Sequence, residues 1–188
     1  QVALRARRLG LDPAAVTVLA STNVDDVTDS ARRSGASCLI VDSIQTMYAD
    51  SLPSAPGSPN QLRECAARLI HLAKTSGIAV VLVGHVTKEG VIAGPRMLEH
   101  MVDAVLYFED ETGSRFRVLR SVKNRFGAAN ELGIFAMGDD GLKEVRNPSA
   151  IFLSRQDDDV AGSVVTVLHQ GTRPLLVEVQ ALTDRGSG

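Results

Sequence analysis

The segment Ser37-Cys-Leu-Ile-Val-Asp42 indicates more about the fold of this chain than any other part of the sequence. It is an apolar run that ends in a carboxylate, and it lacks the alternation of polar and apolar residues typical of a half-exposed strand. Such runs form the strands of parallel sheets, which are covered on both faces. Ile78–Val83 is a second run of this kind, and Val102–Phe108 resembles a third.

Helix signals alternate with these strands. Ser21–Asp26 offers several N-cap side chains before a helix that we expect to end near Gly35. A longer helix begins with an S-x-x-Q capping box at Ser58–Gln61, with Pro59 at the first helical position, and ends at Gly77. Its buried face is predicted to consist of Leu62, Cys65, Ala66, Leu69, Ile70 and Ala73.

Two shorter elements precede the first long strand. Gln1–Leu9 has the apolar spacing of a helix, and Val16–Ala20 is a short apolar run that we expect to form a strand. The alternation of strands and helices predicts an α/β fold with a doubly wound, mainly parallel sheet.

The pattern changes after Glu109. Phe116–Val122, Glu131–Met137 and Leu142–Val145 have the character of strands, and the segments between them are too short for helices. We therefore expect an antiparallel extension of the sheet, with a turn at Asp139-Asp140-Gly141.

A second domain is predicted to begin after an acidic linker at residues 157–162. Ser163–Leu168 and Leu175–Leu182 would pair as a hairpin around Gly171-Thr-Arg-Pro174. Because an isolated hairpin is marginally stable in water, we expect this one to belong to a further domain. The predicted organisation is a core over residues 1–156, the linker, and the start of a second domain over residues 163–188.

Composition excludes some classes of protein. Hydrophobic residues make up 44% of the 188 residues, and the net charge of -2 excludes a uniformly basic nucleic-acid binder but not a local basic patch. Cys38 and Cys65 form no C-x-x-C pair, so we expect no zinc and interpret both as buried thiols. No run approaches the ~20 apolar residues of a membrane span. With no secretory signal at the N-terminus, these features predict a cytoplasmic protein with no membrane partner.

Asp42 is the first candidate for chemistry. At the carboxyl end of a parallel strand it would lie at the edge of the sheet where α/β proteins bind ligands. The segment has the form of a Walker B strand, whose carboxylate orients the water shell of Mg²⁺ on a nucleotide phosphate. Many strands also end in an aspartate that only caps the next loop, and the residue alone does not distinguish the two roles.

His85 follows the second strand and is expected beside Asp42. It could sense a γ-phosphate and pass the signal to the next loop, or it could be hydrogen-bonded at a strand end without a function. That next loop, Thr87–Arg96, carries Lys88 and Arg96 and should open on the same side of the sheet as Leu52–Asn60. Basic loops of this kind can hold a phosphodiester backbone, although solvated surface loops often have the same composition.

The strongest local charge cluster is Arg115–Arg125, which contains five cations and no acid. Most such runs are solvated faces. Its end, Lys123-Asn-Arg-Phe-Gly127, is more specific, because two cations followed by a glycine turn can reach phosphate oxygens from the end of a strand. In an oligomer those oxygens could belong to a nucleotide held by the next subunit, as with an arginine finger.

Further strings support one interpretation. They are Val41-Asp-Ser-Ile-Gln-Thr, Ser54-Ala-Pro-Gly-Ser, Val83-Gly-His-Val-Thr-Lys88, Ile92-Ala-Gly-Pro-Arg-Met-Leu-Glu-His-Met-Val-Asp103, Asn147-Pro-Ser and Gly171-Thr-Arg-Pro-Leu-Leu-Val-Glu-Val-Gln-Ala181. With Lys123-Asn-Arg-Phe-Gly127, which is a hallmark of the family, they closely resemble the RadA (Sms) family of bacterial RecA-like DNA repair proteins. The resemblance covers nearly the whole chain.

The resemblance implies a RecA-like core followed by the first hairpin of a Lon-protease-like domain. It implies a DNA-dependent ATPase that uses ATP and Mg²⁺, forms hexameric rings, processes recombination intermediates and drives branch migration on single-stranded and branched DNA. Recombinase and replication proteins would be further partners. The implied site residues are Asp42 as the Walker B and Mg²⁺ carboxylate, His85 as the sensor, Lys123, Asn124, Arg125, Phe126 and Gly127 at the nucleotide, and Lys88 and Arg96 at DNA.

Parts of that family are missing from the sequence. No G-x-x-x-x-G-K-[ST] string occurs, so we expect a fragment without the family's zinc finger, Walker A loop and most of its Lon-like domain, and without ATP binding of its own. Two alternatives stay open. One is a related RecA-fold ATPase of the replicative-helicase or clock type, and the other is a non-catalytic oligomerisation or interaction unit.

Overall fold

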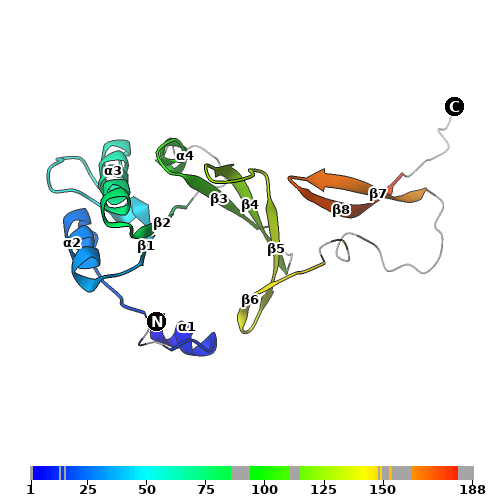
Figure 1. Cartoon of the computed structure of the whole chain (residues 1–188), viewed down its shortest axis with the longest axis horizontal. Helices are drawn as coiled ribbons and strands as arrows, with labels where there is room; N and C mark the ends of the chain where they lie inside the picture. Colours follow the sequence, from blue (N-terminus) through cyan, green and yellow to red (C-terminus); the bar gives the residue numbers. More distant parts are fainter. Residues whose placement is uncertain are drawn as a thin grey trace, which may run out of the picture. The chain divides into compact units, whose positions relative to one another are not determined.

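The computed structural model describes residues 2–12, 14, 16–85, 94–110, 115–147, 149, 153 and 162–181. The chain divides into two compact units, Asp12–Val102 and a second that combines Gln1–Leu11 with Asp103–Gly188. Figure 1 shows the elements along the chain. They are α1 (Val2–Arg8), α2 (Val24–Ser34), β1 (Cys38–Asp42), the 3-10 helix η2 (Ile44–Thr46), α3 (Pro59–Ser76), β2 (Ala79–Val83), α4 (Gly94–Glu99), β3 (Ala104–Asp110), β4 (Phe116–Asn124), β5 (Leu132–Gly138), β6 (Gly141–Glu144), β7 (Ser163–Gln170) and β8 (Arg173–Gln180).

The unit Asp12–Val102 is built on the parallel pair β1 and β2, as the two apolar runs predicted. Cys38 pairs with Ala79 and Asp42 pairs with Val83, so the two strands end at the same edge. The core of the unit packs α2, α3 and α4 against one side of this pair. Its buried residues are Val24, Val27, Val41, Ile44, Met47, Ala49, Leu62, Cys65, Ala66, Leu69 and Leu98.

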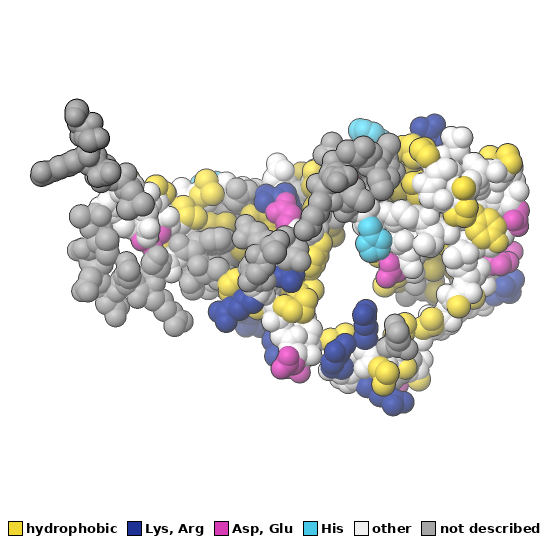
Figure 2. All heavy atoms as spheres, turned by 180° about the vertical axis from the view of Figure 1, so that it is seen from behind, with side chains coloured by type: hydrophobic (Ala, Val, Ile, Leu, Met, Phe, Trp, Pro, Cys, Tyr) yellow, Lys and Arg dark blue, Asp and Glu magenta, His cyan; other side chains and the backbone are white. Residues whose placement is uncertain are grey.

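Only one face of β1 is covered, which corrects the prediction of a strand buried on both faces. Val41 is buried, whereas Cys38 is exposed and Ile40 is 65% exposed, because alternate side chains of a strand point to opposite faces. The prediction of a buried Cys38 is therefore wrong, whereas Cys65 is fully buried in α3. Burial raises the pKa of the Cys65 thiol to about 11. On the face shown in Figure 2, hydrophobic side chains reach the surface at many places.

The segment 16–20 is not a strand, contrary to the sequence prediction. Val18 and Leu19 are 61% and 49% exposed, and no strand within the described residues pairs with them. A short apolar run without a ladder partner leaves its backbone groups to water, so its residue types alone did not produce a strand.

Helix α3 has its predicted bounds but a different N-terminal cap. The Ser58 hydroxyl accepts a hydrogen bond from the Gln61 backbone N–H, as in a capping box. The Gln61 side chain does not return the bond to Ser58. It is buried and instead accepts from Ala49 N at 2.8 Å and donates to the carbonyl oxygens of Ala49, Leu52 and Ser54. Gln61 therefore ties the loop before α3 to the helix, a role that the capping-box prediction missed.

The buried face of α3 also differs slightly from the prediction. Leu62, Cys65, Ala66 and Leu69 are buried as expected, whereas Leu72 is buried in place of a half-buried Ala73. Leu72 belongs to a second small core with Ala31 and Ile78. The helix thus turns its apolar stripe toward α2 at its C-terminal end.

The second unit contains a four-stranded antiparallel sheet in the order β3-β4-β5-β6. The predicted antiparallel strands are present, but they form a sheet of their own and not an extension of the parallel pair, and β3, expected among the parallel strands, already pairs antiparallel with β4. Among the described strands only β1 and β2 are parallel, so the prediction of a mainly parallel sheet is not met. Gly138 pairs with Gly141, so Asp139-Asp140 forms the turn between β5 and β6. Gly141 has φ 101°, a conformation that favours glycine.

The predicted C-terminal hairpin is present as β7 and β8, with strands that extend to a turn at Gly171-Thr172. This turn lies against the start of β5: the Glu131 carboxylate accepts from Thr172 N at 3.0 Å and from its hydroxyl at 2.6 Å. Gly171 has φ 59°, and a Cβ there would lie 2.8 Å from Asn130 O. Residues 154–160, which include most of the predicted linker, lie outside the described residues. No described helix is long and apolar enough to cross a membrane.

The bonds of Gln61 lead to a stability prediction. Replacing Gln61 with Leu keeps most of the side-chain volume but leaves buried backbone groups of Ala49, Leu52 and Ser54 without their partner. We expect Gln61→Leu to lower the free energy of unfolding by about 2–4 kcal/mol. Urea denaturation followed by circular dichroism measures this change. Asn60→Leu, at the exposed neighbouring position, is the matched control. Equal stability of the two variants would contradict the proposed role of Gln61.

Candidate functional site

Asp42 and His85 meet at the carboxyl edge of the β1–β2 pair. Asp42 is the last residue of β1, and His85 lies two residues after Val83, its partner in β2. The His85 Nε2 atom lies 3.9 Å from Asp42 Oδ1, and the two side chains are 74% and 70% exposed. The parallel register therefore brings together two side chains that are 43 residues apart in the sequence, at the edge where α/β sheets bind ligands.

Gln45 connects the two strand ends. It lies in η2, directly after β1, and its Nε2 donates a hydrogen bond of 3.0 Å to the His85 backbone oxygen. Its Oε1 is buried and has no hydrogen-bond partner within the described part of the chain. Gln45 lies in the string Val41-Asp-Ser-Ile-Gln-Thr, and its residue type alone predicted no role for it. Its position three residues after Asp42 was the available signal.

The loop before α3 approaches the same place closely. Gly57 has φ 79°, and a Cβ at this position would lie 3.2 Å from the Gln45 backbone oxygen. A larger residue would therefore be strained by its conformation and crowded by its neighbour. The peptide bond between Asp42 and Ser43 is cis.

The residues at this edge can hold Mg²⁺ only together with other oxygen ligands. Among the described residues no group of three or more His, Cys, Asp and Glu side chains could enclose a metal ion. One exposed carboxylate is still sufficient for Mg²⁺, which proteins often bind through one or two carboxylates, water and substrate phosphates. Asp42 thus fits a metal that arrives with a nucleotide, and the chain supplies no Walker A loop to hold that nucleotide's phosphates.

The end of β4 forms a second candidate site, in the other unit of the chain. Arg125 follows the strand, and two bonds connect it to Asp103. Its backbone N–H donates to Asp103 O at 2.9 Å, and its guanidinium Nη1 lies 3.1 Å from Asp103 Oδ1. Asp103 could not be predicted as a partner of Arg125 from the sequence, because the contact arises only when β3 pairs with β4.

Asn124 shapes the turn that follows. Its Oδ1 accepts from Phe126 N at 3.1 Å, and its Nδ2 donates to Ala128 O at 3.3 Å. A Cβ at Gly127 would lie 3.2 Å from the Asn124 Nδ2 atom. Asn124 and Gly127 therefore build the turn, and Arg125 and Phe126 are the residues that it presents to solvent.

The ion pair of Arg125 is weak enough to be exchanged. The Arg125 and Asp103 side chains are 67% and 42% exposed. Exposed pairs of this kind contribute about 0–1 kcal/mol. A phosphate group, which offers charged oxygens in a geometry that matches guanidinium, can therefore replace Asp103 as the partner at little cost.

Other cations of the basic run are engaged within the sheet. Arg120 on β4 donates to both carboxylate oxygens of Glu109 on β3, at 2.7 and 3.1 Å. These bonds hold the pKa of Glu109 below its usual range and raise that of Arg120. Arg115 lies over the Phe116 ring, with 4.9 Å to its centroid. These contacts are structural, so the run is not one uniform binding surface.

The structure describes only part of the two cations that were predicted to face DNA. Lys88 lies outside the described residues. Arg96 lies in α4, where its backbone is described and its side chain is not.

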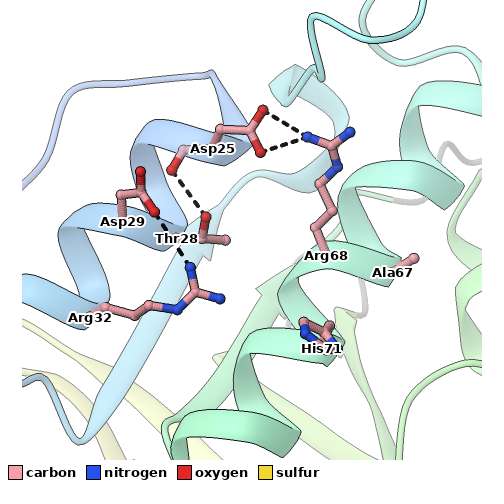
Figure 3. A pocket seen from close by; sticks show the side chains of 7 residues that line it. All are labelled: Asp25, Thr28, Asp29, Arg32, Ala67, Arg68 and His71. Atoms are coloured by element: carbon pink, nitrogen blue, oxygen red, sulfur yellow. Dashed lines mark hydrogen bonds and ion pairs between the residues drawn. The ribbon is translucent and has the colours of Figure 1, made fainter.

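An open hollow of about 530 Å³ lies between α2 and α3 (Figure 3). Its lining is charged, but the charges are paired with one another. Arg68 donates to both carboxylate oxygens of Asp25, at 2.6 and 2.7 Å, and Arg32 lies 3.4 Å from Asp29. Arg68 also contacts Glu64 and the Ser51 hydroxyl, so it joins the two helices and the loop. None of the predicted site residues lines this hollow.

Comparisons with known proteins connect these features to a family. No protein-family model matches the sequence. Curated proteins named DNA repair protein RadA do match it. The Pseudomonas aeruginosa protein is 58% identical over 184 residues, which cover 98% of this chain and 41% of the relative. The Bacillus subtilis protein is 54% identical over 182 residues, and the Escherichia coli protein 53% over 184.

Solved structures agree on the fold. The crystal structure of the RadB recombinase superposes with a TM-score of 0.53 at 17% identity, covering 76% of this chain and 71% of that chain. A KaiC-like protein from Pyrococcus horikoshii gives a TM-score of 0.50, also at 17% identity, and covers 76% of this chain and 68% of that chain. At this identity the likeness shows a RecA-like α/β fold and nothing finer.

The sequence relatives are stronger evidence for the family than the structural neighbours, because their sequence identity is high and extends over almost the whole of this chain. The chain spans about 40% of the length of the curated relatives it matches. Over that stretch, the chain belongs to the family of the DNA repair protein RadA.

Proposed function

We propose that this chain is part of a DNA-dependent ATPase of recombination and repair, which processes recombination intermediates and drives branch migration on single-stranded DNA. The observation that carries the proposal is the Asp42–His85 pair at the carboxyl edge of two parallel strands, in a chain that is 58% identical to a RadA protein. The 188 residues contain no Walker A string, so we infer that ATP binding beside Asp42 requires residues from outside them.

In this proposal Asp42 would hold the hydrated Mg²⁺ that accompanies ATP, and His85 would contact the γ-phosphate. Mg²⁺ supplies neutralisation of the charge that develops on the phosphate oxygens. Gln45 is a positioning residue, because its amide bond to the His85 backbone oxygen couples the loop after β1 to the end of β2. A change at the phosphate could thereby reach the segment that follows His85, which carries Lys88.

The same proposal covers the assembly and the C-terminal hairpin. We infer a hexameric ring in the cytoplasm that encircles single-stranded DNA, with recombinase and replication proteins as further partners. The hairpin β7–β8 would begin a Lon-protease-like domain over residues 163–188, after the core 1–156 and a linker. The contact of Glu131 with Thr172 supports a defined position of its turn on β5.

Asp42 gives the first functional prediction. In a full-length RadA-family protein, alanine at the position aligned with Asp42 should lower the ATP turnover number about 100-fold or more, since it removes a metal-orienting charge. The fold should persist, because the Asp42 side chain is 70% exposed. Phosphate release and circular dichroism measure the two effects. Alanine for Asp139, an exposed turn residue, is the control. Near-normal turnover would remove Asp42 from the site.

The basic loop that carries Lys88 and Arg96 gives the second functional prediction. Alanine at the positions of Lys88 and Arg96 should weaken binding of single-stranded DNA in a full-length relative. Each lost phosphate contact should also lower the slope of log affinity against log salt concentration by about 0.7. Fluorescence anisotropy at several salt concentrations measures the slope. Lys74→Ala, at the exposed end of α3, provides the comparison. An unchanged slope would place the two cations away from DNA.

Arg125 gives the third functional prediction. Its guanidinium is exposed at a turn. We propose that it reaches a nucleotide held by the next subunit. Alanine at its position should reduce ATPase activity about 1,000-fold in a full-length relative, as expected for an arginine finger. Rings that mix this variant with subunits lacking the Walker A lysine should regain part of the activity, since some interfaces combine two intact halves. Mixed rings that assemble but stay inactive would contradict action between subunits.

A further inference from the structure

Phe126 is the most exposed large hydrophobic residue in the described part of the chain, with 82% of its surface accessible to solvent. A phenylalanine ring contributes most when its large apolar area is removed from water. Because the Phe126 ring lies almost entirely in solvent, it contributes little to the stability of the free chain. Singly exposed apolar residues are common on protein surfaces, so the case for Phe126 rests on its position in a hydrogen-bonded turn beside an exposed guanidinium.

The turn holds Phe126 in place by hydrogen bonds on both sides. Phe126 N donates to the Asn124 side chain, which also binds Ala128 O, and Arg125 N donates to Asp103 O. A Cβ at Gly127 would lie 3.2 Å from the Asn124 Nδ2 atom, so a larger residue would crowd this turn. The backbone is thus fixed while the ring is exposed, so the ordering cost of binding is partly met before a ligand arrives.

The neighbours of Phe126 favour a nucleotide over an apolar protein surface. The turn from Lys123 to Glu131 reads Lys-Asn-Arg-Phe-Gly-Ala-Ala-Asn-Glu and contains no second large apolar residue. Protein interfaces place their aromatic anchors within a patch that excludes water, and the segment Lys123–Glu131 does not supply such a patch by itself. An aromatic ring beside an exposed guanidinium is instead the combination that binds a base by stacking and its phosphate by charge.

We propose that Phe126 is a stacking platform for a nucleobase, with Arg125 at the phosphate of the same or the adjoining nucleotide. The ligand is either a free nucleotide or a base of single-stranded DNA, and the two share this chemistry. The proposal deepens the function proposed above and rests on it in taking nucleotides as ligands. It adds that the turn recognises a base and not phosphate alone.

The absence of tryptophan from the sequence allows a direct test on this chain. Phe126→Trp introduces a single indole, whose fluorescence is quenched when a base stacks on it. We expect quenching by oligodeoxythymidylate or by ATP, and none by an abasic oligonucleotide of equal length or by tripolyphosphate, which carry the phosphates alone. The oligonucleotide arm and the ATP arm distinguish the two sources of the base. Phe108→Trp, on β3 at 52% exposure, is the matched control and should not respond.

A second measurement separates stacking from apolar packing. Phe126→Leu keeps an apolar side chain but removes the flat ring, and should weaken binding of the responding ligand about 5- to 150-fold, whereas Phe126→Tyr should bind normally. The proposal is overturned if the indole responds equally to ligands with and without bases, or to none of them. It is also overturned if Phe126→Leu binds as tightly as the unchanged chain. Labelled-oligonucleotide anisotropy that still reports binding in those cases would leave the proposed DNA function standing and remove only the stacking role.

Discussion

The parallel pairing of β1 and β2 is the constraint on which the first unit depends. Its register sets Asp42 opposite Val83 and so brings the segments after both strands to one edge. A shift of one residue would turn every side chain of β1 to the other face, burying Asp42 against the helices and exposing Val41. The apolar stripe of α3 prevents that shift, because it packs on the face that carries Val41.

Polar side chains then fix what the apolar core leaves undetermined. The loop between β1 and α3 has irregular backbone, and buried backbone groups must find partners. Gln61 provides them for Ala49, Leu52 and Ser54 from within α3. Gln45 extends the arrangement to the end of β2 through its bond to His85. The geometry at the candidate phosphate edge is thus supported by two glutamines, neither of which contacts a phosphate in the proposed mechanism.

The turn after β4 follows the same logic in the other unit. Asn124 and the backbone of Asp103 hold the turn, and the residues that they leave exposed are Arg125 and Phe126. Within Lys123–Gly127, Asn124 and Gly127 therefore build the turn, and the turn exposes Arg125 and Phe126 to solvent. The contacts indicate which side chains of the motif are available for a ligand.

Much of the secondary structure could be predicted locally. The apolar runs predicted β1 and β2, and the serine and glycine caps predicted the bounds of α3. The short spacing after Glu109 predicted antiparallel strands. Each of these signals depends only on neighbours in the sequence. The strings that resemble one family also gave the candidate residues, whose roles stay predictions.

Contacts between distant segments could not be predicted in this way. The spacing of Ser58 and Gln61 fitted a capping box, yet the burial of Gln61 directs its amide to a loop about ten residues earlier. The bond of Asp103 to Arg125 exists only because β3 pairs with β4, and the exposed face of β1 reflects which helices pack on it. Residue types set what a segment can form on its own. Burial and partners, which decide where a polar side chain finds its hydrogen bonds, are properties of the folded chain.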